Sequence, residues 1–438
     1  MIVRAAGRIG ALRTTCGTPP GAASWALLAM AIACSPAFTQ ATERGTSGDF
    51  SLLDFGADPS GIEDSSPAFA RLMEAVGDRR QVRITIPLGT YRLASRVVLN
   101  AVGNAESYGM RIQGAGEDVT ELRVDNPDGG LQFHGTHINR LSFTVSDLSM
   151  VAVRENAGVA LAFDTANPGD HHSRQFNAEN LLIRGERFDR GSFNAGIAVR
   201  NAWYPRLDNV KITSVYGPRP AESDPMEFAI LLEDCYSPLV RGCYVWGARN
   251  GLAYRARDKQ PEDGIVRDSY FVGCDTGVTV DLKADTAQWE EPAFHVETCH
   301  IAYRDRGVVL HGVRQANISH CLFYCSDRQG AAFHGGGPSR DFDPLDIDLS
   351  YASDVIIDGS IFTEPANPRR VAVRIGPDSG YAIIRGNQFN LEGTAVRNES
   401  KTASFVTGNV FGGRRDFSQG LRRYVDPIGT LVISDAAP

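Results

Sequence analysis

A short segment that begins with glycine or another small residue recurs along the chain, and it constrains the fold more than any other feature. Its form is glycine, apolar, any residue, apolar, then an ionisable residue, as in Gly307-Val308-Val309-Leu310-His311. Clear copies begin at Gly196, Gly251, Gly277, Gly307, Gly330 and Gly393, and looser copies at Gly130, Ala229 and Arg370. Alternation with a period of two predicts short β-strands with one buried face.

A second recurring pattern lies between these segments and carries a small or polar residue at its fourth position. It reads apolar, two residues, small or polar, one residue, apolar, as in VRGCYV from Val240 and ISHCLF from Ile318. The fourth positions are residues 148, 181, 210, 243, 269, 299, 321, 360, 387 and 409, which are 22 to 39 residues apart. One such unit cannot bury its apolar face alone, so the units must stack. We therefore predict an all-β chain that forms a single-stranded right-handed parallel β-helix, with coils ~4.8 Å apart.

The fourth positions predict a ladder of small side chains at one bend of the coil. Its members are Cys243, Ser269, Cys299, Cys321, Ser360, Asn387 and Asn409. Small polar residues at a bend can bond backbone groups of neighbouring turns, and a buried free cysteine packs as a small hydrophobe. We expect the cysteines to pack in this way, although the spacing leaves a Cys299–Cys321 disulfide open. No metal is expected, because no CxxC pair or His–Cys cluster recurs.

The first 41 residues are typical of a secretory signal peptide. Three arginines precede a short apolar run at residues 25–33, and small residues follow it. The run is too short to cross a bilayer, and no later run is long enough, so no membrane span is expected. We predict a secreted or periplasmic protein. A lipid anchor at Cys34 is an alternative, which Ala31 disfavours because a larger aliphatic residue is usual there.

The charge of the predicted mature chain bears on its partners. Without residues 1–41 the chain would carry 41 Lys and Arg against 52 Asp and Glu, a formal net charge of −11. Such an acidic balance argues against nucleic acid as the main partner. The predicted organisation is a linker at 42–50, an N-terminal cap with the first coils at 51–125, the β-helix at 126–415 and a C-terminal cap or tail at 416–438.

The segment after the linker resembles the start of a known family. It reads LLDFGADPSGIEDSSPAFARLMEAV from Leu52 and VRITIPLGTYRL from Val82. Pro67 lies near the first turn of a predicted helix, whose apolar residues fall on one face. The stretch is similar to the opening of the pectate-lyase-superfamily β-helix proteins, in which a capping helix starts the solenoid. The resemblance implies a short capping helix over an otherwise open sheet edge. Members of that family include lyases, glycoside hydrolases, epimerases and tailspike-like depolymerases.

The final residue of each glycine-initiated segment is predicted to point outward. Side chains alternate faces along a strand, so Val309 and His311 face out where Val308 and Leu310 face in. The same register in each coil gives an outward row of Arg200, Glu233, Arg255, Asp281, His311, His334, Arg374 and Arg397. The neighbouring outward row is mostly small or apolar: Ala198, Leu231, Ala253, Thr279, Val309, Ala332, Ala372 and Ala395. Insertions at 256–263, 283–293 and 336–349 begin just after the ionisable row, which predicts a charged groove for a polymer. A merely solvated face is the alternative.

β-Elimination on an acidic, uronate-containing polysaccharide is the first functional hypothesis. That reaction needs a neutralised substrate carboxylate and a base within reach. We predict His311 and His334 as acid and base, with Asp281 to orient or acidify a histidine. Arginine matches a carboxylate with a fixed fork of donors. The predicted substrate-binding residues are Arg255, Arg374, Arg200, Glu233, Asp343 and Asp346, and no cofactor is predicted.

Two other hypotheses stay open. Glycoside hydrolysis could use Glu233 and Asp281, which are two rungs apart, or ~9.6 Å, at or just past the range of ~6.5–9.5 Å for an inverting pair. The sharper motifs of related polygalacturonases and alginate epimerases are missing; for example, Asp343-Pro344-Leu345-Asp346 lacks the histidine of an Asp-Pro-His-Asp pattern, which leaves epimerisation a runner-up. A non-catalytic cell-surface or polysaccharide-binding β-helix is the third hypothesis, and it predicts no perturbed titrating group in the groove.

Overall fold

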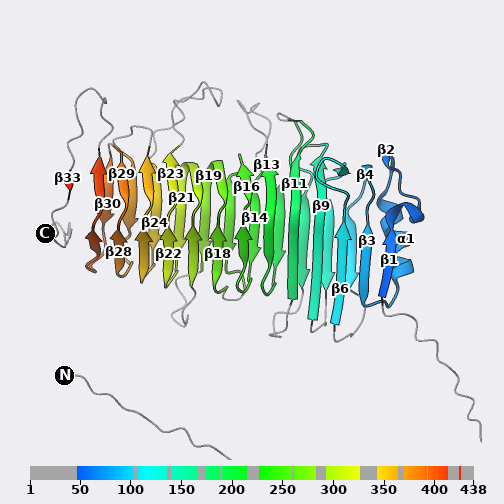
Figure 1. The fold of residues 1–438 in the computed structure, drawn as a ribbon, viewed down its shortest axis with the longest axis horizontal. Helices are drawn as coiled ribbons and strands as arrows, with labels where there is room; N and C mark the ends of the chain where they lie inside the picture. Colours follow the sequence, from blue (N-terminus) through cyan, green and yellow to red (C-terminus); the bar gives the residue numbers. More distant parts are fainter. Residues whose placement is uncertain are drawn as a thin grey trace, which may run out of the picture. The chain divides into compact units, whose positions relative to one another are not determined.

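The computed structural model is a right-handed parallel β-helix, which confirms the predicted fold class. It describes residues 47–101, 107–135, 140–165, 174–187, 190–214, 226–258, 261–282, 293–325, 343–363, 369–391, 393–412 and 424–425. Within the unit Gly45–Pro438, successive coils stack side by side along one axis (Figure 1). The predicted signal peptide and most of the predicted C-terminal segment lie outside the described residues, so these domain boundaries stay predictions.

Three columns of parallel strands run along the stack. The first contains β1 (Ser47–Ser51), β3 (Gln81–Thr85), β6 (Ser107–Gln113), β9 (Arg140–Ala152), β11 (Arg174–Gly185), β13 (Arg206–Thr213), β15 (Leu239–Arg241), β18 (Gly264–Arg267), β20 (Phe294–Glu297), β22 (Ala316–Ser319), β25 (Val355–Asp358), β28 (Ala382–Arg385) and β31 (Phe405–Thr407). The second contains β2 (Ser60–Asp64), β4 (Gly89–Leu93), β7 (Thr120–Val124), the later parts of β9, β11 and β13, then β16 (Tyr244–Trp246), β19 (Tyr270–Asp281), β21 (His300–His311), β23 (Leu322–Cys325), β26 (Ile361–Thr363), β29 (Gln388–Asn390) and β32 (Val410–Gly412). The short β33 (Tyr424–Val425) pairs with β32 in the antiparallel sense.

The third column carries the predicted ionisable row. It contains β5 (Val97–Ala101), β8 (Gly129–Gly135), β10 (Val159–Thr165), β12 (Ala195–Arg200), β14 (Phe228–Glu233), β17 (Asn250–Arg255), the later parts of β19 and β21, then β24 (Leu345–Ser350), β27 (Val371–Ile375) and β30 (Thr394–Asn398). All of its pairings are parallel and in register, apart from a shift early in the β19–β21 pair. Residues at matching positions of successive coils therefore become neighbours along the axis.

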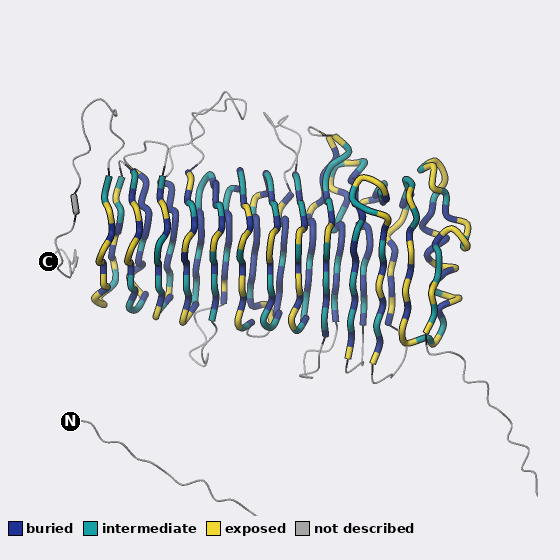
Figure 2. Tube along the Cα trace, viewed as in Figure 1, coloured by how far each residue is buried: buried dark blue, intermediate teal, exposed yellow. Residues whose placement is uncertain are grey.

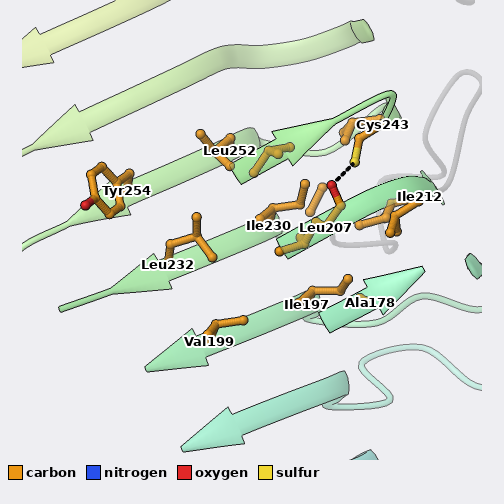
Figure 3. Close-up of a cluster of buried hydrophobic side chains, with 14 of the residues drawn as sticks. Ala178, Ile197, Val199, Leu207, Ile212, Ile230, Leu232, Cys243, Leu252 and Tyr254 are labelled. Atoms are coloured by element: carbon orange, nitrogen blue, oxygen red, sulfur yellow. Dashed lines mark hydrogen bonds between the residues drawn. The ribbon is translucent and has the colours of Figure 1, made fainter. Parts of the chain in front are cut away.

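The core follows from the period of two. In β12, Ile197 and Val199 are buried, whereas Ala198 and Arg200 are partly exposed. Buried and exposed positions alternate in this way along most strands (Figure 2). Side chains from successive coils meet inside, as Figure 3 shows for the coils around β12, β14 and β17. Burial of apolar area is the main favourable term for such a stack.

The recurring glycine has a packing reason. Its position is at the corner between the second and third columns, where a Cβ atom would meet core side chains. A Cβ on Gly251 would lie 2.7 Å from the Phe271 ring, and one on Gly277 would lie 2.6 Å from Ile301. Contacts this short leave no room for a methyl group. Glycine thus marks this corner in several coils, and Ala229 holds the same position in β14.

The predicted ladder of small side chains is confirmed. The Ser360 N–H donates to Asn387 Oδ1 (2.9 Å), and the Asn387 N–H donates to Asn409 Oδ1 (2.9 Å). Each of these side chains pairs a backbone donor of the preceding coil, which would otherwise be buried without a partner. The six cysteines between Cys235 and Cys325 are buried free thiols, so no Cys299–Cys321 disulfide is present. Burial raises the pKa of the Cys243 thiol to about 12, which keeps it protonated and unreactive.

The N-terminal segment begins with a 3-10 helix, η1 (Leu52–Phe55), and includes the predicted helix, α1 (Ser66–Val76). Asp64 Oδ1 accepts a hydrogen bond from the Ser66 N–H (2.9 Å) at the start of α1, and Pro67 occupies its first turn. Phe69, Leu72 and Val76 are buried in the same core cluster as the first coils. The amphipathic face of α1 thus packs into the core of the β-helix, and its capping role stays a prediction.

Candidate functional site

The predicted ionisable row is present from β12 to β21. Arg200, Glu233, Arg255, Asp281 and His311 pair rung by rung from β12 to β21. The observed row begins earlier than the predicted one, at β5, and its rung after His311 is Ser350. Its full order is Asn100, His134, Asp164, Arg200, Glu233, Arg255, Asp281, His311 and Ser350.

The rung after His311 is Ser350, so the predicted place of His334 in the row is wrong. His334 itself lies outside the described residues. The strand that follows β21 in the third column is β24, within the segment predicted as an insertion. The sequence of β24 does not match the recurring segment, because Asp346 lies opposite Gly307, at a position where earlier coils have glycine.

Arg374 and Arg397 also lie in a different row from the one predicted. Arg374 pairs with Asp348, and Asp348 pairs with Val309, so both arginines continue the neighbouring row. Ala372 is buried at the corner position and does not face out. The two C-terminal segments match the motif two residues out of register, because alternation alone cannot distinguish a strand from itself shifted by one period of two.

A cleft of about 240 Å³ opens over the first half of the third column. It is lined by Arg96, Asp128, Leu131, Gln132, Val159, Ala162, Phe163, Asp164, Ala198, Val199, Arg200, Leu231, Glu233 and Arg257. Its outward-facing floor includes Ala162 and Ala198, which stand side by side on adjacent rungs. Because alanine fills little space beyond the backbone, these two rungs leave a hollow between longer neighbours.

The row forms one side of this cleft. Asp164, Arg200 and Glu233 occupy three successive rungs, so that an arginine separates two carboxylates. Asp128 precedes β8 and Arg96 precedes β5, and both contribute to the lining from the start of the strands. The lining of the cleft thus contains both cationic and anionic side chains, as a site for a polar, charged ligand requires.

Glu233 is the most enclosed of the acidic residues that line the cleft, with 9 % of the residue exposed. The Arg255 Nε donates to Glu233 Oε1 (2.9 Å), and the Arg257 guanidinium lies 3.9 Å from Glu233 Oε2. The Arg255 guanidinium also stands 5.1 Å from the centre of the Phe228 ring. These cations compensate the burial of the carboxylate. The carboxylate of Asp164, by contrast, makes no hydrogen bond or ion pair with the part of the chain that the structure describes.

The Arg200 Nη2 donates a hydrogen bond to Asp258 Oδ2 at 2.8 Å. Its Nε is buried and has no partner among the described residues. Asp258 belongs to the segment that follows β17, and Asp234 binds the backbone of this segment. The buried Asp234 carboxylate accepts hydrogen bonds from the N–H groups of Arg257 (2.7 Å) and Asp258 (3.1 Å).

The other predicted site residues lie beyond the cleft. Asp281 and His311 occupy adjacent rungs past Arg255, and the His311 ring meets the Tyr351 ring edge to face at 5.4 Å. Asp343 is 3.6 Å from Arg369. The prediction for Asp346 as a substrate-binding residue is wrong, because its side chain is fully buried and paired with Arg370. The roles of Asp281 and His311 stay predictions.

Five lining or neighbouring residues were missed: Arg96, Asp128, His134, Asp164 and Arg257. A signal for Asp164 was present, since Leu161, Ala162, Phe163 and Asp164 repeat the alternation that ends in an ionisable residue. Arg96, Asp128 and Arg257 come from connections, whose course no strand pattern predicts.

Two further observations bound the chemistry. Within the described ranges, no group of three or more His, Cys, Asp and Glu residues could hold a metal ion. No helix among the same residues is long and apolar enough to span a membrane.

No protein-family model and no curated protein matches the chain. Solved structures do match. The surface adhesin PfbA of Streptococcus pneumoniae shares 15% identity at a TM-score of 0.53, with 84% of this chain and 93% of that chain covered. The mannuronan C-5 epimerase AlgE6 A-module of Azotobacter vinelandii shares 12% identity at 0.51, with 84% and 100% covered.

Two more structures extend this range. The catalytic unit of a GH87 alpha-1,3-glucanase from Streptomyces thermodiastaticus shares 14% identity at a TM-score of 0.51, with 85% of this chain and 71% of that chain covered. ORF18 of Geobacillus virus E2 shares 12% identity at 0.50, and the match covers 84% of this chain and 61% of that one. The chain thus spans less than two thirds of ORF18. At these identities the likeness shows a common β-helix fold.

Proposed function

We propose that this protein is an enzyme that hydrolyses glycosidic bonds of an acidic polysaccharide in the cleft described above. The observation that carries the proposal is the arrangement of Asp164, Arg200 and Glu233, with a carboxylate on each side of an arginine along one row. Hydrolysis of a glycoside uses two carboxylic groups, one to protonate the leaving oxygen and one to activate water or form a covalent intermediate.

The separation of the two acids favours an inverting reaction. Asp164 and Glu233 are two rungs apart, which corresponds to ~9.6 Å between their backbones. Inverting enzymes hold their carboxyl groups ~6.5–9.5 Å apart, and retaining enzymes only ~5–5.5 Å apart. Side chains that lean toward each other over Arg200 would reach the inverting range. We assign Glu233 as the base, because Arg255 and Arg257 lie beside its carboxylate, and Asp164 as the acid.

The structural relatives support a polysaccharide as the substrate. By their names, one of them acts on mannuronan and another on an alpha-1,3-glucan, although a surface adhesin shares the same fold. The export predicted from residues 1–41 would deliver the protein to the compartment where such polymers occur.

A second candidate is β-elimination on the same class of polymer. It is favoured by Asp281 and His311, which lie on adjacent rungs of the row and leave an imidazole partly exposed. A histidine there could remove the sugar C5 proton. In this version Arg255 would contact the substrate carboxylate, although its Nε is already bonded to Glu233.

A panel of acidic polysaccharides distinguishes these reactions. Hydrolysis predicts new reducing ends without the ultraviolet chromophore of an unsaturated uronate. Asp164→Asn and Glu233→Gln should each lower the rate by on the order of 10²–10⁴, whereas His311→Ala should retain it. A chromophore that disappears in His311→Ala would establish elimination instead. Binding without any product from the panel would make the protein a binding module and overturn the enzymatic proposal.

A further inference from the structure

The contact between Asp258 and Arg200 resembles the contact that a substrate carboxylate would make with Arg200. The Asp258 carboxylate stands 2.8 Å from an Arg200 terminal nitrogen and 3.8 Å from the Arg257 Nε. Two arginines of the cleft lining thus share one carboxylate, and that carboxylate is itself largely exposed, at 62 %. A carboxylate of a bound sugar would need the same partners.

Arg200 is poorly satisfied in this arrangement. An arginine presents five N–H donors in a rigid fork that fits a carboxylate with two parallel hydrogen bonds. In the structure a single Arg200 nitrogen contacts Asp258, while the Nε is buried and unpartnered among the described residues. Leaving a buried charged donor unpaired is costly. Reorientation of the guanidinium toward a ligand in the cleft would recover the lost hydrogen bond.

We propose that Asp258 is an internal stand-in for the carboxylate of a uronate unit, and that an acidic polysaccharide displaces it from Arg200. The inference rests on the acidic substrate class of the proposed function and assigns its carboxylate subsite. The displaced carboxylate moves into solvent, and the incoming one lies between Arg200 and Arg257. Asp258 thereby competes with substrate and excludes weakly charged polymers.

Asp234 makes the exchange possible without unfolding the segment. Its buried carboxylate holds the backbone N–H groups of Arg257 and Asp258 at 2.7 and 3.1 Å. The backbone therefore stays in place when the Asp258 side chain turns away. Arg257 keeps its position over Glu233, so the exchange leaves the proposed base undisturbed.

The test is calorimetric binding of a purified uronate oligosaccharide and of its carboxyl-reduced, neutral counterpart. An Asp164→Asn background prevents turnover and changes no ion pair of Arg200 or Arg257. Because Asp258 is exposed, its removal should have the modest effect of a surface ion pair: Asp258→Asn should bind the uronate about two- to fivefold more tightly. The neutral sugar should bind both proteins equally. Arg200→Met should lose at least about tenfold in uronate affinity, as expected for loss of a charged hydrogen bond.

Asp208→Asn is the matched control. Asp208 is an exposed aspartate paired with Arg241 in the first column, so this variant makes the same charge change away from the cleft. It should leave both affinities unchanged. Weaker or equal uronate binding by Asp258→Asn, or no uronate binding by the parent protein, would overturn the inference. Tighter binding by Asp258→Asn, together with no cleavage of any polymer by the protein that retains Asp164, would instead sustain the inference and refute the proposed hydrolysis.

Discussion

At the scale of single residues, one substitution in the repeat changes the interior of the β-helix. Asp346 takes the corner position of the recurring glycine, and its carboxylate is contacted there by Arg370 Nε (2.9 Å) and the Tyr303 hydroxyl (2.7 Å). All three side chains are fully buried. Burial alone would lower the pKa of Arg370, but the charge and hydrogen bonds of Asp346 raise it above its ordinary value. Burial also raises the pKa of Asp346, although Arg370 and its hydrogen bonds oppose this, so the two groups depend on each other.

Removing one partner of this pair should be far more harmful than removing both. Arg370→Met strands a buried carboxylate and should lower the free energy of unfolding by about 3–5 kcal/mol. The double variant Arg370→Met/Asp346→Ala should recover much of that loss. Denaturant unfolding of the two single variants and the double variant measures the coupling. Additive losses would contradict the assignment of a buried ion pair.

Asp58 predicts a dependence of stability on acid pH. Its carboxylate accepts hydrogen bonds from the N–H groups of Glu63 (2.7 Å) and Ser60 (2.9 Å), which lower its pKa from 3.8 to about 2. A lowered pKa adds stability that is fully present above the unfolded value and is lost as the pH falls through about 2. Stability of the N-terminal cap should therefore fall between pH 3.8 and about 2, and less steeply in Asp58→Asn. Equal slopes in acid unfolding curves would show that Asp58 makes no contribution.

At the scale of elements, α1 is the part with the clearest single task. It places Phe69, Leu72 and Val76 in the core cluster next to the first coils. The strand edges at the start of a stacked sheet otherwise offer unpaired backbone groups to other chains. The helix contributes apolar burial, and we predict that it also limits edge-to-edge association.

Phe69→Ala tests this role. Loss of a buried phenylalanine costs about 3–5 kcal/mol, and we expect it to loosen α1 locally rather than to unfold the distant coils, because each coil contacts only its neighbours. Light scattering should then show association at concentrations where the parent chain is monodisperse. Met73→Ala, at a partly buried position of the same helix, serves as the milder comparison. Equal scattering by both variants would argue that α1 does not protect the edge.

The elements also show how far the sequence predicts the structure. The strands, the ladder and the row from Arg200 to His311 follow from a period of two and a recurring corner, which are local properties. The sequence pattern did not predict β24, because Asp346, which pairs with the distant Arg370, occupies a position that glycine holds in other coils. A charged groove beside the row was predicted, but the place and depth of the cleft were not, because they depend on which coils carry alanine outward and on connections such as that of Arg96.

At the scale of the whole described β-helix, the stacked coils set a regular spacing between side chains of the same row. Parallel pairing places one residue of each coil in the same row, so residues more than thirty positions apart become adjacent, as Asp164 and Arg200 do. Rigid spacing of this kind suits a ligand that itself repeats. We propose that three rungs of this row, with Arg200 between two carboxylates, hold one acidic sugar chain.

A crystal structure of the Glu233→Gln variant with an acidic oligosaccharide would show whether the sugar chain lies on these three rungs. We predict a sugar chain across Ala162, Ala198 and Leu231, with one carboxylate on Arg200 and the Asp258 side chain turned away. A chain bound in another column, or one whose carboxylate leaves the Arg200–Asp258 contact intact, would contradict it.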